Sequence, residues 1–311
     1  MPETSLKPGA LVALTGATGF IGRHLLHDLA RRGYRCRVLL RRPIDMELEC
    51  SSAVIGDLTR PLNLSTALAG ADAIVHSAGV SPGVSGLPDA DHRTLSSEAT
   101  RILALAAQRA RVKKFVFLSS IRAQTGPTTP GVVREDQAPV PTDVYGKAKL
   151  EAEAILAELD LEWVALRPVS VYGKGMKGNL AQLVKLARTP LPLPFSDPNA
   201  RRSLLSVGNL AAAVATLLAF PGPLRRPLIV ADLEALSVAE MIAAMRDALG
   251  RRPGIVPFPS SVLKRAMEMT GNAGAYERLA CPLVADPSAL AALGWSPQIS
   301  TRQGLRSLMQ D

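Results

Sequence analysis

The chain has 311 residues, of which 47% are apolar and only 4% aromatic, and 36 basic against 27 acidic side chains give a formal net charge of +9. This apolar fraction excludes an intrinsically disordered chain, while three cysteines in a chain of this length exclude a small disulfide scaffold and fit free thiols in a reducing cytoplasm. The longest apolar stretches fall well short of the ~20 residues that a membrane span needs, so we expect a cytoplasmic protein with no membrane partner.

Short apolar runs alternate with helix-like segments through the first half of the chain. Strands are predicted at residues 10–14, 36–40, 53–55, 73–76, 115–119 and 163–166, and helices at 21–32, 62–68, 94–109 and 145–159. Apolar runs without polar alternation are typical of parallel strands that are covered on both faces. The alternating order of strands and helices therefore predicts an α/β fold with a doubly wound parallel sheet.

The second half of the chain is richer in Gly and Pro and has a less regular pattern. Helices are predicted at residues 208–220, 238–249, 261–269 and 287–293, with a short strand at 228–230. We expect residues 1–168 to form the core of a nucleotide-binding domain. Residues 169–311 are expected to form mainly a smaller α/β substrate lobe, with some segments returning to the core.

A glycine-rich turn, Gly16-Ala17-Thr18-Gly19-Phe20-Ile21-Gly22, follows the first predicted strand and opens the first predicted helix. In this position the first glycine permits a tight turn, the second lets the backbone approach a pyrophosphate, and the third allows close packing of helix and sheet. The helix N-terminus adds free N–H groups and a partial positive charge. The segment therefore predicts a dinucleotide site.

The end of the second strand bears on which dinucleotide binds. An acid at this position would accept hydrogen bonds from the adenosine ribose of NAD, but here the strand is followed by Arg41 and Arg42. Guanidinium groups suit a 2′-phosphate, so NADP is favoured over NAD; the alternative is that Arg41 stacks on adenine or faces water and NAD binds. Asp57, after the third strand, either binds the adenine amino group or caps the following segment. His76 ends the fourth strand where small residues let a cofactor approach, and no catalytic role is assigned to it.

Tyr145 and Lys149 are four residues apart on a predicted helix, so they share one helix face. A nearby ammonium would lower the tyrosine pKa from about 10, so that the phenol could exchange a proton with a substrate hydroxyl while hydride moves to or from a nicotinamide. Ser120 follows the fifth strand and could bind the same substrate oxygen. The order of glycine turn, Ser120, Tyr145 and Lys149 predicts an oxidoreductase, with Tyr145 either catalytic or merely an exposed helix residue.

These residues, together with Leu166-Arg167-Pro168 and Val171-Tyr172-Gly173, resemble the extended short-chain dehydrogenase/reductases, the NAD-dependent epimerase/dehydratase family. The resemblance spans nearly the whole chain and implies a Rossmann-type domain with a small substrate lobe, often dimeric through a helix pair. It implies a cofactor site formed by the following residues: Gly16, Thr18, Gly19, Phe20, Ile21, Gly22, Arg41, Arg42, Asp57, Leu58, His76, Ala78, Tyr145, Lys149 and Pro168.

Two downstream segments, residues 171–179 and 201–210, are similar to UDP-hexose 4-epimerases. They are more similar still to the bacterial 4-ketoreductases that form UDP-N-acetylquinovosamine. The resemblance implies that Asn179 contacts the diphosphate or sugar, Arg202 the diphosphate, and Arg278 the nucleotide end. Arginine suits a diphosphate, although Arg202 could instead be a surface charge. The family usually carries Asn where this chain has Ser96, and no metal is expected.

Three classes of function remain open at this point. The first is a UDP-sugar 4-epimerase or 4-ketoreductase, and the arginines at 41 and 42 favour exchangeable NADP and hence the reductase. The second is a non-catalytic dinucleotide sensor on the same fold. The third, a nucleic-acid binder, is disfavoured because the arginine doublets are scattered along the chain and aromatics are scarce.

Overall fold

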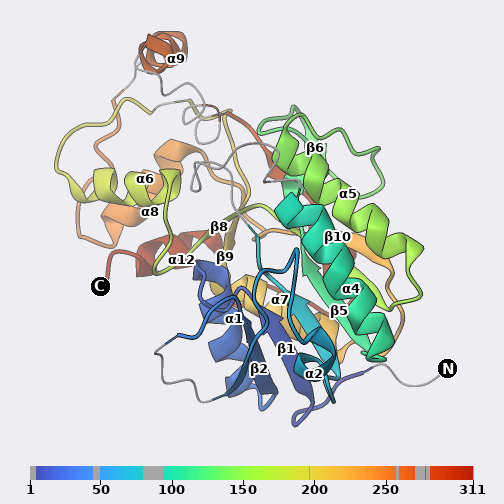
Figure 1. The fold of residues 1–311 in the computed structure, drawn as a ribbon. Helices are drawn as coiled ribbons and strands as arrows, with labels where there is room; N and C mark the ends of the chain where they lie inside the picture. Colours follow the sequence, from blue (N-terminus) through green and yellow to red (C-terminus); the bar gives the residue numbers. More distant parts are fainter. Residues whose placement is uncertain are drawn as a thin grey trace.

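The computed structural model describes residues 5–44, 50–79, 94–195, 197–256, 259–269, 277 and 281–310 (Figure 1). Its centre is a seven-stranded sheet in the order β10-β7-β5-β4-β1-β2-β3, in which every pair of neighbours is parallel. The strands are β1 (Leu11–Thr15), β2 (Arg35–Leu40), β3 (Ser51–Val54), β4 (Ala73–His76), β5 (Lys114–Leu118), β7 (Trp163–Pro168) and β10 (Arg226–Val230). The predicted α/β class with a Rossmann-type parallel sheet is confirmed.

Helices cover both faces of this sheet (Figure 1). Helices α1 (Phe20–Arg31) and α7 (Val207–Ala219) pack together on one face, while α4 (Ala99–Arg109) and α5 (Val144–Glu158) cover the other, with the short α2 (Leu64–Ala67) beside α4. Successive strand residues divide between these faces: Val12 and Leu14 belong to the α1–α7 core, and Ala13 belongs to the α4–α5 core. Burial on both sides is the physical reason for the continuous apolar runs in the sequence.

The second half of the chain divides between the sheet and a C-terminal lobe. The strand predicted at 228–230 is β10 at the sheet edge, and α7 covers the sheet beside α1. The C-terminal lobe consists of β8 (Ser170–Tyr172), β9 (Leu204–Ser206), α6 (Asn179–Arg188), α8 (Val238–Asp247) and α12 (Thr301–Ser307). Further elements are β6 (Val132–Val133), which pairs with β11 (Val284–Ala285), and helices α9 (Ser260–Met269) and α11 (Ser288–Ala291).

Helices α6 and α12 were not predicted, although each carries a local signal: apolar residues at 180, 183, 184 and 187 follow a helical spacing, and Ser300 and Gln303 form a capping box. Both pack against α8, and Leu183 of α6 and Leu305 of α12 are buried in a third core with Met241 of α8. Packing against α8 therefore buries the apolar side of two helices whose local signals are already present in the sequence.

A buried polar network joins the lobe to the sheet. The Asp232 carboxylate, just after β10, accepts from the Tyr172 hydroxyl of β8 at 3.0 Å and from the Asn209 amide of α7 at 2.7 Å. It also accepts from the backbone N–H of Ser206, where β9 ends and α7 begins. Because Asp232 is only 1% exposed, these bonds replace its hydration and fix β8 against α7 and β10.

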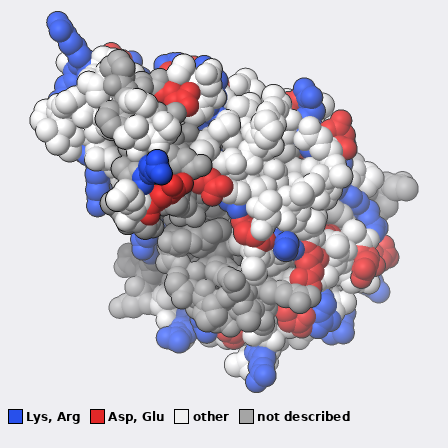
Figure 2. Space-filling view, turned by 90° about the horizontal axis from the view of Figure 1, so that it is seen from above, with Lys and Arg blue, Asp and Glu red and all other residues white. Residues whose placement is uncertain are grey.

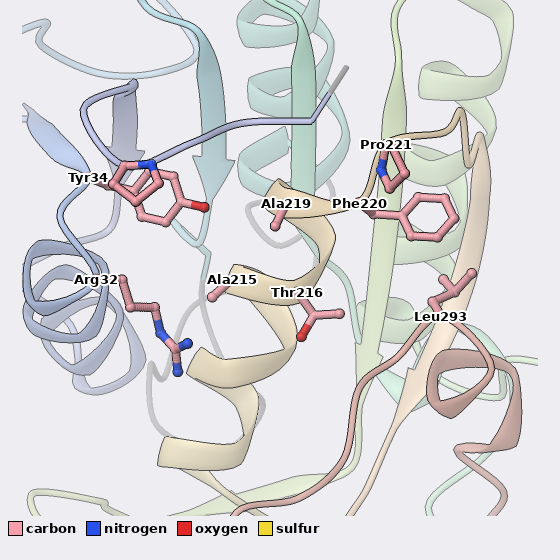
Figure 3. Close-up of a pocket in the computed structure, with 9 residues that line it drawn as sticks. Arg32, Tyr34, Ala215, Thr216, Ala219, Phe220, Pro221 and Leu293 are labelled. Carbon is pink, nitrogen blue, oxygen red and sulfur yellow. The ribbon is translucent and has the colours of Figure 1, made fainter. Parts of the chain in front are cut away.

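One pocket, of about 490 Å³, opens at the amino-terminal edge of the sheet (Figure 3). It is lined by Pro8, Arg32, Tyr34, Ala215, Thr216, Ala219, Phe220, Pro221 and Leu293. Ligands of open parallel sheets bind at the opposite, carboxyl edge, where the residues singled out in the sequence lie.

On the face seen in Figure 2, the described basic and acidic residues are interspersed, and these residues form no broad basic patch there. Among the described residues, no helix combines the length and apolarity required to cross a bilayer.

Candidate active site

The glycine turn joins the end of β1 to the start of α1, and close backbone packing requires two of its glycines. Gly16 has a φ of +72°, and a Cβ there would lie 2.7 Å from the backbone nitrogen of Ala78, at the end of β4. A Cβ on Gly22 would overlap the Gly16 carbonyl oxygen. The turn therefore holds the ends of β1 and β4 and the first turn of α1 in direct backbone contact.

The same turn leaves room for a phosphate-bearing ligand. Gly19 is the N-cap of α1, and a Cβ there would meet only the Gly16 carbonyl oxygen, at 3.3 Å. The first N–H groups of a helix have no acceptor within the helix, so those following Gly19 are available to an anion. Thr18 is exposed beside them, and Phe20 and Ile21 open the helix. This arrangement fits the pyrophosphate of a dinucleotide.

Next to the glycine turn, the His76 side chain connects the ends of β1 and β4 to α4. The imidazole Nδ1 lies 2.7 Å from the Thr15 hydroxyl, and Nε2 lies 3.1 Å from the Thr100 hydroxyl of α4. Complete burial, with a smaller contribution from Lys149, lowers the pKa of His76 to about 3, so the ring is neutral at physiological pH. The side chain therefore links β1, β4 and α4, while the backbone N–H of Ala78 donates to Thr15 Oγ1 at 3.1 Å.

At the far end of the same sheet edge, Arg41 and Asp57 form an ion pair. An Arg41 Nη lies 3.0 Å from Asp57 Oδ2, and the other carboxylate oxygen accepts from the Thr59 N–H and hydroxyl. The bonds from Thr59 are the main reason that the pKa of Asp57 is lowered, and the Arg41 charge adds to them. Arg42 is exposed beside this pair, and Leu58 packs partly into the α4–α5 core.

Ser120 and Tyr145 come together from two different elements. Ser120 follows β5 and caps the short helix η2 (Ile121–Ala123), while Tyr145 lies in the first turn of α5, whose N-cap is Asp143. The Ser120–Tyr145 hydrogen bond and the Arg122 charge lower the pKa of Tyr145, but burial outweighs both, so the pKa is raised above its usual value of 10. The phenol is therefore protonated at neutral pH.

Lys149 lies one helical turn beyond Tyr145 and is only 3% exposed. Its Nζ donates to the Leu118 carbonyl at 2.9 Å, and lies 4.6 Å from the Phe117 ring centroid and 5.9 Å from that of Tyr145. Burial lowers the pKa of Lys149 to about 8, while the Glu153 carboxylate opposes this change. A Cβ on Gly79 would come within 3.3 Å of Nζ, so glycine at this position leaves Lys149 room.

A buried ion pair lies next to the elements that carry Ser120, Tyr145 and Lys149. The Arg167 guanidinium of β7 and the Glu153 carboxylate of α5 are 4% and 5% exposed and are hydrogen-bonded through two nitrogens. Glu153 also accepts from the Ser119 hydroxyl, and Arg167 donates to the Gln124 side chain. The pair thereby ties α5 to the ends of β5 and β7, next to Pro168.

The residues expected to bind substrate lie in three different settings. Asn179 is half-buried at the first position of α6. Arg202 is 5% exposed, and its guanidinium donates to the backbone carbonyls of Pro127 and Cys281, so a contact with a diphosphate would require it to exchange these partners. Arg278 lies outside the described residues.

Sequence patterns did not reveal several residues of the site. Asp143 could have been found, because an Asp three residues before Gly146 at the start of a helix is a capping signal. Arg122 gave no such signal, since its pairing with Asp143 depends on the fold.

Ser96, where the resembling family usually carries Asn, lies in η1 (Thr94–Glu98), a π-helical turn that leads into α4 and packs against α5. Its carbonyl accepts from the Thr100 hydroxyl at 2.5 Å.

Comparison with known families gives a match across most of the chain. Residues 12–229 match the NAD dependent epimerase/dehydratase family. This range runs from β1 to β10 and contains the glycine turn, Ser120, Tyr145, Lys149 and Arg202.

Among curated proteins, the UDP-glucose 4-epimerase of Vibrio cholerae is 29% identical over 310 residues, which cover 96% of this chain and 94% of that enzyme. The ceramide reductase of Caulobacter vibrioides is 28% identical over 255 residues, covering 80% of this chain and 74% of that protein. Among solved structures, MoeE5 in complex with UDP-glucose and NAD superimposes with a TM-score of 0.74 at 27% identity, covering 96% of this chain and 97% of that chain.

Proposed function

Because the chain belongs to the NAD dependent epimerase/dehydratase family, we propose that it transfers hydride between NAD(P) and C4 of a UDP-hexose, as a 4-ketoreductase or a 4-epimerase. The observation that carries this proposal is the meeting of Ser120, Tyr145 and Lys149 beside the glycine turn, at the carboxyl edge of the sheet. The UDP-glucose 4-epimerase relative and the MoeE5 complex with UDP-glucose support the substrate class.

In the reducing direction, the Tyr145 hydroxyl donates its proton to the ketone oxygen of the sugar as hydride reaches the carbon. A bound reduced nicotinamide supplies that hydride. Ser120 orients the same substrate oxygen, and the largely protonated Lys149 stabilises the phenolate that forms on Tyr145. Burial raises the pKa of Tyr145, so the phenol holds the proton that this step transfers.

The test is to supply NADPH or NADH with UDP-4-keto-hexoses and follow absorbance at 340 nm, and to incubate UDP-hexoses with cofactor and follow their epimers by chromatography. Tyr145→Phe is expected to lower either activity by at least ~100-fold, because it removes the transferred proton. Tyr34→Phe is the matched control, since Tyr34 is a buried tyrosine that lines the pocket at the opposite edge of the sheet. Turnover of an unrelated ketone alone, for example a ceramide precursor, would overturn the substrate assignment. Full biological activity in Tyr145→Phe, together with no turnover by the unaltered protein, would instead favour a non-catalytic sensor.

We propose NADP as the preferred cofactor, held by the cofactor residues given above. Arg41 and Arg42 directly follow β2, and the nearest acid in the sequence, Asp45, comes only after Pro43. Arg41 is paired with Asp57, while Arg42 is exposed. Arg42→Ala is therefore expected to weaken NADP binding about tenfold and to leave NAD binding nearly unchanged, as measured by calorimetry. Tighter binding of NAD than of NADP by the unaltered protein would refute this preference.

We propose that the protein is a homodimer through α4 and α5, which lie side by side on one face of the sheet (Figure 1). Ile102, Leu105 and Ile155 are only partly buried on these helices, and Ala154 is exposed. Ala154→Arg is expected to give monomers in sedimentation experiments, because it adds a charge to the exposed surface of α5. A monomeric unaltered protein would contradict the proposal.

A further inference from the structure

Arg122 lies two residues beyond Ser120, in the short helix η2. Its backbone N–H donates to the Ser120 hydroxyl oxygen at 3.1 Å. The Ser120 hydroxyl, which is also hydrogen-bonded to Tyr145, therefore takes its orientation from η2. Whatever holds η2 in place also sets the geometry between Ser120 and Tyr145.

The side chain of Arg122 is held by the start of α5. Its guanidinium forms an ion pair with Asp143 Oδ2, and the Arg122 side chain is only 15% exposed. Asp143 is the N-cap of α5, and its other oxygen accepts from the Gly146 N–H at 2.6 Å. One carboxylate thus joins Arg122 to the helical turn that carries Tyr145.

The backbones of η2 and α5 are in equally close contact. A Cβ on Gly146 would overlap the carbonyl oxygen of Arg122, so only glycine allows α5 to approach η2 this closely. Arg122 therefore contacts the first turn of α5 through its backbone and through its side chain, and neither contact leaves the guanidinium free to swing into solvent.

The position of Arg122 places a positive charge beside the reacting groups. Its charge lowers the pKa of Tyr145 and also that of the neighbouring Arg202. Among the described residues, Lys149 on the same helix has its Nζ 5.9 Å from the Tyr145 ring centroid and bonded to the Leu118 carbonyl. His76 on β4, which is buried and neutral, interacts with Lys149. Arg122 is thus a second cation at the phenol, supplied by a different element from Lys149.

We propose that Arg122 is a positioning residue of the active site: its pairing with Asp143 anchors the first turn of α5 and holds a positive charge against the Tyr145 phenol. This inference rests on the proposed function, in which Tyr145 exchanges a proton with the substrate. Arg122 is then a second cation near Tyr145 besides Lys149. Its place beside the tyrosine could not be predicted from the spacing of residues in the sequence.

The test compares Arg122→Gln, Arg122→Lys and Asp143→Asn by titrating Tyr145 directly. The proteins are produced with fluorinated tyrosine, whose phenol is more acidic, and each tyrosine is followed by ¹⁹F NMR, with Tyr145→Phe assigning the resonance. Circular dichroism over the same pH range verifies that each protein remains folded. Neither substrate nor cofactor is needed, so an incorrect substrate assignment would not affect the result.

The two charge changes are expected to act in opposite directions. Arg122→Gln removes the cation and should raise the Tyr145 pKa by about 1 unit, whereas Asp143→Asn removes the neutralising anion, retains a capping side chain, and should lower it by about 0.5 unit. Arg122→Lys keeps the positive charge, so the pKa of Tyr145 in this variant should be close to that in the unaltered protein. If the Arg122–Asp143 pair had only a structural role, Arg122→Gln and Asp143→Asn would shift the pKa of Tyr145 in the same direction. That result would overturn the proposal. If Arg122→Gln does not fold, an unchanged or raised pKa in Asp143→Asn is sufficient to overturn it.

Discussion

Replacement of Lys149 by methionine would measure what the fold gives up in stability to keep an amine beside Tyr145. Lys149 is 3% exposed, and burial lowers its pKa from 10.5 to about 8. In the unfolded chain the same amine is hydrated and titrates near 10.5. The folded protein therefore binds this proton less tightly than the unfolded chain does, and the charged form opposes folding at neutral pH.

The size of this effect follows from the gap between the two pKa values. A gap of about 2 to 3 pKa units corresponds to about 3 kcal/mol of lost stability at pH 7. The cost is fully present below pH 8 and disappears as the pH rises toward 10.5, because the amine is then neutral in both states. Methionine fills a similar volume but leaves the Leu118 carbonyl without its Nζ donor, which costs about 1 kcal/mol. Lys149→Met should therefore be more stable than the unaltered protein by about 2 kcal/mol at pH 7.

Urea denaturation at pH 7 and at pH 9.5 provides the assay. The stability advantage of Lys149→Met is expected to shrink by about 2 kcal/mol between these two pH values, while the activity of the variant is lost at both. Lys147→Met is the matched control, because Lys147 is exposed on the same helix and its replacement should change stability by less than ~0.5 kcal/mol. A difference between Lys149→Met and the unaltered protein that does not change with pH would refute the reasoning.

Two further predictions concern the turn and the lobe. Gly22→Ala should lower the free energy of unfolding, measured by thermal melts, by about 1–3 kcal/mol, since its Cβ would overlap the Gly16 carbonyl. In the same assay, Gly208→Ala on α7, where a Cβ has room, should be neutral or slightly stabilising. A Gly22→Ala protein as stable as Gly208→Ala would contradict the packing argument. Arg246→Met should cost about 3 kcal/mol or more in urea denaturation, because the buried guanidinium donates to carbonyls at the end of α6 and in the loop after α8. Arg251→Met, which removes one exposed bond, should cost less than ~1 kcal/mol, and equal losses would refute the assignment.

The sequence by itself determined the features that depend on local periodicity. Strands buried on both faces must be apolar throughout, so β1, β2, β4, β5 and β7 could be read directly, and their alternation with helices determined the parallel sheet. The glycine turn was recognisable because its spacing is a local steric requirement. Tyr145 and Lys149 could be paired because four residues make about one helical turn, and the family match supports the same reading.

Only the tertiary structure decided which charged groups are paired with one another. Arg41 is joined to Asp57, Arg122 to Asp143, and Arg202 to the carbonyls of Pro127 and Cys281.

These partners are far apart in the chain, and an arginine carries no mark of whether it faces solvent, a carboxylate or a buried carbonyl. Helices α6 and α12 are a different case, because the apolar spacing of α6 and the capping box of α12 are local signals, and the structure adds only that both helices pack against α8. The sequence could therefore supply the chemistry of the catalytic groups, but the charges around them depend on contacts that exist only once the sheet, α5 and the lobe have assembled.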